Sequence, residues 1–126
     1  MIDIDKAWHV LHFLLTGTSS EGDFPQGFLL TAGNPVGDVD VGYGPVRSFT
    51  VREVLILRDY LVSVDKEVLR ERFLPSTFSE NEIYPNVWDR SDQDDEWPYF
   101  EGAFEETVLF IRETADKGMA LLIYLN

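Results

Sequence analysis

Residues 4–17, with the sequence IDKAWHVLHFLLTG, decide how this chain folds. Most side chains in this stretch are apolar, and on an α-helix they would extend around most of the circumference instead of forming one stripe. Only a narrow ridge, which includes His9 and His12, is polar. A helix of this kind needs neighbours on more than one side. We therefore predict an internal helix that ends at Gly17.

The clearest helix start in the chain is Thr50-Val51-Arg52-Glu53, which has the pattern of a capping box. In this motif the Thr50 hydroxyl accepts a hydrogen bond from the amide of Glu53, and the Glu53 carboxylate reaches back to the amide of Thr50. The helix that follows is predicted to bury one stripe of apolar side chains: Val54, Leu57 and Leu61. A shorter helix is expected over residues 64–73, with Ser63 as its N-cap.

The last predicted helix covers residues 101–117, because Phe104, Val108, Ile111 and Ala115 repeat at helical spacing. Gly118 is expected to end it in a left-handed conformation. Residues 74–100, which contain three of the six prolines, are predicted to form a long irregular connection.

Three segments have the composition of strands. Residues 27–32 (GFLLTA) are predicted to form a short buried strand. Residues 36–46 contain glycines at 37, 42 and 44 and are predicted to combine a strand with a turn. Residues 119–125 (MALLIYL) form a near-continuous apolar run, which is typical of a central strand. Because helices and strands mix without regular βαβ alternation, the predicted class is α+β.

The chain has 126 residues, and 10 Lys+Arg against 23 Asp+Glu give a net charge of −13. This excess of acid argues against nucleic acid or an anionic membrane as a partner, because both require a basic patch. Without cysteine, a disulfide, a thiolate metal site and a cysteine nucleophile are excluded. No secretory signal pattern is present, and no apolar run approaches the ~20 residues of a membrane-spanning helix. We therefore expect a cytoplasmic protein.

Two blocks of sequence resemble a known family. They are DIDKAWH at residues 3–9, continuing to Gly17, and VGYGPVR at 41–47 followed by TVREV at 50–54. Both resemble the YfbM-like family of small bacterial proteins of unknown function. Ile83-Tyr84-Pro85, Trp88 and the ADKG of residues 115–118 are similar to later landmarks of that family.

The resemblance extends over nearly the whole chain and implies an α+β fold, with a small mixed sheet packed by three to four helices in a single domain, residues 1–126. It also implies that the family's usual N-terminal extension is absent, because the DKAWH helix begins almost at Met1. The resemblance implies no reaction.

Four side chains are candidates for a ligand-binding site: His9, His12, Tyr43 and Arg47. The two histidines stand about 60° apart on a helix, so both can approach one ligand. The phenol and the guanidinium can bind an anion. The alternative interpretation is structural, with both imidazoles bonded to backbone carbonyls and Arg47 paired with Asp38 or Asp40. Two histidines without further ligands make a poor metal site, so neither a metal nor a cofactor is predicted.

Residues 80–106, the acidic aromatic segment, contain ten carboxylates and one basic residue, so 10 − 1 places −9 of the total −13 in 27 residues. Trp and Tyr, which anchor many interfaces, are interleaved with the charge. The partner-binding candidates are Trp88, Asp92, Asp94, Asp95, Glu96, Trp97 and Tyr99. The alternative is a solvated acidic loop whose aromatic side chains are buried in the core.

Two functional hypotheses of different classes follow. The favoured one is a non-catalytic binding protein, for example an immunity-type inhibitor that neutralises a basic toxin domain through the acidic aromatic segment. The other is a small-ligand-binding protein or an enzyme with a site around His9, His12, Tyr43 and Arg47. No nucleophile elbow and no HExxH zinc helix is present, so no catalytic residue is predicted and an enzyme is the less favoured alternative.

Overall fold

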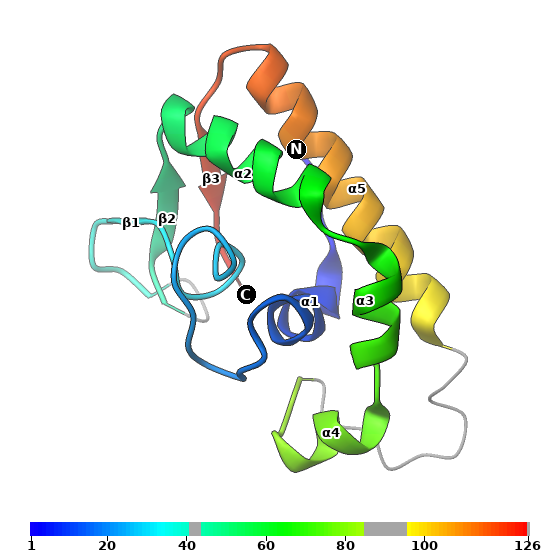
Figure 1. The fold of residues 1–126 in the computed structure, drawn as a ribbon. Helices are drawn as coiled ribbons and strands as arrows, with labels where there is room; N and C mark the ends of the chain where they lie inside the picture. The colour runs from blue at the N-terminus through cyan, green and yellow to red at the C-terminus, as the bar shows by residue number, and fades with distance from the viewer. Residues whose placement is uncertain (41–43, 85–95, 126) are drawn as a thin grey trace.

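The computed structural model describes residues 1–40, 44–84 and 96–125 (Figure 1). In chain order the elements are a 3₁₀-helix η1 (Asp5–Ala7), α1 (Trp8–Thr16), β1 (Asn34–Val36), β2 (Val46–Phe49), α2 (Val51–Ser63), α3 (Lys66–Arg72), α4 (Pro75–Glu80), α5 (Trp97–Asp116) and β3 (Leu121–Ile123). The α+β class is therefore confirmed. No helix in the described ranges is both long enough and apolar enough to cross a membrane.

The sheet has the strand order β1-β2-β3, and both pairings are antiparallel. Pro35 lies opposite Arg47, and Arg47 lies opposite Ile123. The described strands thus form an antiparallel sheet where the family resemblance implied a mixed one. Only residues 37–45 join β1 to β2, which is too short for the crossover that a parallel pair needs.

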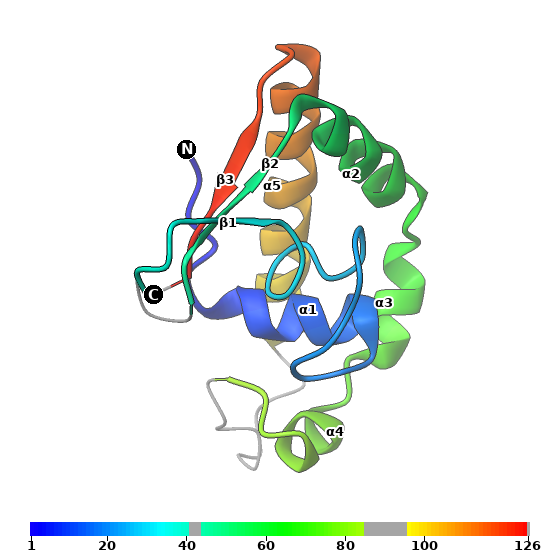
Figure 2. The ribbon, with the colours of Figure 1, turned by 90° about the vertical axis from the view of Figure 1, so that its left-hand side faces the viewer.

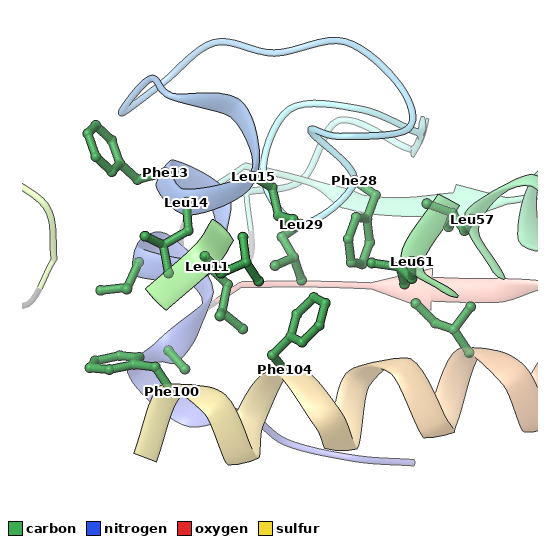
Figure 3. Close-up of a cluster of buried hydrophobic side chains, with 14 of the residues drawn as sticks. Leu11, Phe13, Leu14, Leu15, Phe28, Leu29, Leu57, Leu61, Phe100 and Phe104 are labelled. Atoms are coloured by element: carbon green, nitrogen blue, oxygen red, sulfur yellow. The ribbon is translucent and has the colours of Figure 1, made fainter. Parts of the chain in front are cut away.

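Helix α1 lies inside the molecule, as its sequence predicts. Every residue from Val10 to Leu15 is buried, and the helix packs against both α3 and α5. Figure 2 shows α2 and α5 on the same side of the sheet. In Figure 3, Leu11 of α1, Leu29 of the following loop and Phe104 of α5 point into the space between these elements. This shared core places the polar ridge of α1 among buried neighbours.

The helix ends follow the predicted caps in most places. Both hydrogen bonds of the capping box at Thr50 and Glu53 are present, and the three predicted stripe residues of α2 are buried. Gly118 follows α5 with φ +64°, as expected. The N-cap of α3, however, is Asp65 and not Ser63, because the Asp65 carboxylate accepts a hydrogen bond from the amide of Glu67.

The predicted irregular connection, residues 74–100, contains more helix than expected. Pro75 opens α4, and α5 begins at Trp97, with Pro98 in its first turn, instead of at residue 101. Proline is favoured in the first turn of a helix because its missing N–H has no intrahelical partner there. Two of the three prolines in this range therefore lie in the first turn of a helix.

The prediction of a strand at residues 27–32 is wrong, although its burial is correct. The segment turns back on itself, and the Gly27 carbonyl accepts hydrogen bonds from the amides of Thr31 (2.9 Å) and Ala32 (2.8 Å). The turn ends at Gly33, where φ is +110° and a Cβ atom would lie 2.8 Å from the Phe49 ring. No residue other than glycine fits this position without displacement.

The prediction that residues 119–125 form a central strand is also wrong for the sheet as described. β3 covers only Leu121–Ile123, and it is an edge strand that pairs with β2 alone. Leu121 is buried against the helices, whereas Leu122 is 65 % exposed. β3 is therefore an edge strand with the composition of a central strand.

The capping box gives a direct test of how α2 is held. Thr50→Ala should lower the free energy of unfolding by about 1 kcal/mol, because the amide of Glu53 loses its acceptor. Urea unfolding followed by circular dichroism measures this loss. Thr50→Ser keeps the hydroxyl and should retain most of that stability. If both variants lose the same amount, the methyl group and not the cap stabilises the helix start.

Candidate functional site: the polar ridge of the first helix

The His9 imidazole bridges two separate segments of backbone. Its Nε2 donates a hydrogen bond to the Ser19 carbonyl (2.7 Å), and its Nδ1 accepts one from the amide of Tyr84 (2.9 Å). Because a carbonyl can only accept and an amide can only donate, the ring is neutral with its proton on Nε2. The ring also stacks on Trp8, whose indole stacks in turn on Tyr84. Burial lowers the pKa of His9, which favours the same neutral form.

His12 lies one turn further along the same ridge and is completely buried. Its Nε2 donates to the Glu21 carbonyl (2.9 Å), so this ring too carries its proton on Nε2. Nδ1 is buried and has no hydrogen-bond partner among the described residues. Burial is the main cause that lowers the pKa of His12, and the positive charge of Arg47 lowers it further.

Arg47 of the central strand is only 7 % exposed, and its guanidinium bonds to backbone alone. It donates to the carbonyls of Phe28 (2.9 Å), Leu29 and Ala32, which all belong to the turn after residue 27. No carboxylate in the described ranges pairs with it, so the expected ion pair with Asp38 or Asp40 is not formed. Burial lowers the pKa of Arg47 to about 10, which still leaves it charged at neutral pH.

The structure thus brings His9, His12 and Arg47 close together but directs all three at backbone groups. Tyr43, the fourth candidate, lies outside the described residues. The three described side chains fix the loop between α1 and β1 through the carbonyls of residues 19, 21, 28, 29 and 32. For the two histidines this is the arrangement that the structural interpretation of the sequence expects, whereas Arg47 bonds to backbone carbonyls and not to Asp38 or Asp40.

One open groove, of about 440 Å³, lies at the C-terminal end of α1. It is lined by Phe13, Leu15, Thr16, Gly17, Arg72, Leu74 and Thr77. None of the candidate ligand-binding residues is among them. Arg72, which the sequence analysis did not single out, donates to the Leu14 carbonyl (2.8 Å) and so satisfies the end of α1. The sequence around Arg72 does not indicate this role, because the helix end that Arg72 satisfies lies 58 positions earlier in the chain.

The partner-binding candidates divide between described and undescribed residues. Trp88, Asp92, Asp94 and Asp95 lie outside the described residues. Trp97 is partly buried, with its ring 5.5 Å from Phe73 and under the guanidinium of Arg70. Glu96 is partly exposed, and Tyr99 is 51 % exposed. Trp97 therefore belongs to the packed part of the segment and Tyr99 to its surface.

Three of the described carboxylates of the segment, Glu101, Glu105 and Glu106, lie in the first three turns of α5. Glu105 pairs with Lys66 of α3. Glu101 and Glu106 have no ion pair with any residue that the structure describes. In the same described ranges, no group of three or more histidine or carboxylate side chains is placed to hold a metal ion.

The fold and the ridge together define a small α+β domain whose buried polar side chains bond to its own backbone. The chain belongs to the family described as "Domain of unknown function (DUF1877)", whose model matches residues 1–124. It is similar to Protein YfbM of Escherichia coli (strain K12), with 36 % identity over 87 residues, which are 68 % of this chain. That match spans only about half, 52 %, of the relative's own length.

A solved structure agrees with this assignment. The crystal structure of YfbM from Escherichia coli, a protein of unknown function, superposes with a TM-score of 0.74 and 29 % sequence identity. The superposition covers 96 % of this chain and 77 % of that one. The resemblance to a YfbM-like family is therefore confirmed. The description of the family and that of the solved structure both state that the function is unknown.

The three carbonyls bonded by Arg47 predict a large loss of stability on its removal. Arg47→Met should lower the free energy of unfolding by about 3 kcal/mol, because several buried carbonyls lose their donor. The matched variant Arg58→Met removes an exposed ion pair with Asp59 and should cost less than about 1 kcal/mol. Urea unfolding measures both. Equal losses in the two variants would show that Arg47 is not a central support.

The two neutral histidines predict acid sensitivity. Their pKa values in the folded chain lie below 6.5, so the unfolded chain binds more protons as the pH falls through this value. Their contribution to stability should be complete above about pH 7 and should decrease below pH 6.5. Proton NMR titration of the imidazoles, together with urea unfolding at each pH, measures both effects. An imidazole that titrates at or above 6.5 would contradict the lowering of its pKa by burial.

Proposed function

We propose that this protein is a non-catalytic binding protein that recognises a basic protein through its acidic aromatic segment. Neutralisation of a basic toxin domain, in the manner of an immunity-type inhibitor, is a function of this kind. The observation that carries the proposal is the outer surface of α5, where Glu106, which has no ion pair with any described residue, shares a helix face with the half-exposed side chains of Tyr99 and Leu109.

The spacing along α5 gathers these side chains on one side of the helix. Tyr99, Gly102, Glu106 and Leu109 follow one another at intervals of three, four and three residues, which keeps them on one face. Tyr99 is 51 % and Leu109 is 56 % exposed. A Cβ atom at Gly102 would meet nothing within 4 Å, so the surface between them is open. We call these four residues together with Glu101 the α5 surface.

The two kinds of side chain have separate roles in binding. Carboxylates attract a cationic partner over a distance of about 10 Å and raise the rate of association. Tyrosine and leucine then lose water on contact and slow dissociation, because large apolar anchors carry much of the binding energy at interfaces. Glu106 has no ion pair with any described residue, so a basic partner meets its full charge, whereas the charge of Glu101 already acts on Lys66 of α3 and helps to raise the pKa of that lysine.

The three described side chains of the competing hypothesis already have partners. His9, His12 and Arg47 donate hydrogen bonds to backbone carbonyls, and none of them lines the groove at the end of α1. A ligand that took these donors would have to release the loop between α1 and β1. This cost supports the binding proposal over a ligand site on the polar ridge.

Charge reversal on the α5 surface tests the proposal. The chain is immobilised, basic proteins from a lysate of the source organism are captured, and the association rate of the purified partner is measured by surface plasmon resonance. Glu101→Lys with Glu106→Lys should slow association about tenfold at low salt, and salt should weaken binding by the unmodified chain.

The matched control is Glu21→Lys with Asp23→Lys, two exposed carboxylates in the loop after α1. Both pairs change the net charge equally, from −13 by +4 to −9. The control pair should therefore change the rate by about twofold or less, since its charges lie far from the contact. Equal slowing by the two pairs, or no basic protein captured, would overturn the proposal.

A further inference from the structure

The edge position of β3 conflicts with its sequence. Residues 118–126 contain no charged side chain, and Leu121-Leu122-Ile123 has the composition of a strand with neighbours on both sides. In the sheet described here it pairs only with β2. Natural edge strands are usually protected by charged residues or proline, because their free N–H and C=O groups can pair with another chain.

The opposite edge of the same sheet shows that protection. β1 has Pro35 at its middle position, which has no N–H to offer to a further strand. The side-chain amide of Asn34 is bonded within the molecule, to the Ser48 carbonyl and the Glu53 carboxylate. On the free side of β3, by contrast, residues 120–125 make no backbone hydrogen bond to any described residue outside the sheet. The two edges are therefore unequal, and β3 is the open one.

The outward face of the sheet is uncharged as well. Its cross-strand rows are Asn34, Ser48 and Leu122, and Val36 with Val46, while Tyr124 follows Leu122 on the same side. Leu122 and Tyr124 are 65 % and 53 % exposed. Because α2 and α5 lie on the other side of the sheet, no helix of the described ranges lies over this face (Figure 2).

We propose that β3 pairs with the β3 strand of a second copy of this chain, in antiparallel orientation about a two-fold axis. Two identical strands that run antiparallel offer each other the same row of donors and acceptors, so one edge serves both copies. The pairing joins two three-stranded sheets into one sheet of six strands. It also brings Leu122 and Tyr124 of both copies onto a common apolar surface.

The distribution of charge favours a second copy over a basic partner at this edge. A basic partner would need carboxylates, and β3 has none. Two molecules of charge −13 repel each other, and the uncharged strand is where they can approach with least repulsion. Since β3 is only three residues long, the interface is small and the dimer is expected to dissociate in the micromolar range.

Salt separates this proposal from the proposed function, so either can fail without the other. High salt screens the repulsion between two acidic copies and should strengthen the dimer, whereas it should weaken binding of a basic protein to the α5 surface. The oligomeric state is measured by sedimentation equilibrium from micromolar to millimolar protein, at low and high salt. The mass should rise from 14.5 kDa toward twice that value as concentration and salt increase.

Leu122→Lys tests the contact itself. It places like charges across the two-fold axis and should raise the dissociation constant at least about tenfold. The matched control Val62→Lys introduces the same charge at a similarly exposed position on α2, outside both proposed surfaces, and should leave the constant within about twofold. Circular dichroism checks that both variants fold.

Hydrogen exchange on the unmodified chain gives an independent measurement. Amides on the free side of residues 120–124 should become more protected as the protein concentration rises, because they are bonded only in the dimer. A mass of 14.5 kDa at millimolar protein in high salt would overturn the proposal. So would equal effects of the two lysine variants, or protection that is independent of concentration.

Discussion

The guanidinium of Arg47 is the interaction on which the arrangement of the other parts depends. It extends from β2, the central strand, and holds the carbonyls of Phe28, Leu29 and Ala32 in a region where water does not reach them. Arginine suits this task because its planar fork offers five N–H donors and keeps its charge when buried. The turn can therefore exist in the core without a partner strand, and its apolar side chains can pack against α1 and α5.

The two histidines extend the same principle along α1. The positive charge of Arg47 helps to lower the pKa of His12, and the His12 ring donates a hydrogen bond to the Glu21 carbonyl. The His9 ring donates to the Ser19 carbonyl and accepts from the amide of Tyr84. Arg47, His9 and His12 thus each satisfy backbone groups of a segment that lies outside the helices and strands. A backbone group that is buried without a hydrogen-bond partner destabilises the folded chain by more than most single contacts stabilise it. These residues therefore determine the path of the loop.

Local patterns predicted the elements whose stability is local. The internal helix α1, the capping box at Thr50 and the glycine after α5 depend on neighbours within one or two turns, and all three are present. The turn at residues 27–32 could not be predicted, because its carbonyls are satisfied by a side chain 15 to 19 positions away. The spacing of His9 and His12 is equally compatible with ligand binding and with bonds to backbone, since both need the same face of the helix.

The placement of charge connects the two surfaces that we propose. A chain of net charge −13 must keep its carboxylates away from any surface where it meets its own copy, and the nine residues at its end have none. It can meanwhile concentrate carboxylates where a cationic partner arrives, and residues 80–106 hold ten of the 23. Repulsion between two acidic copies weakens the dimer, and the same negative charge strengthens binding of a basic protein. The net charge therefore favours the basic partner over a second copy. The α5 surface ends at Leu109 and β3 begins at Leu121, so eleven residues separate two surfaces of opposite electrostatic character.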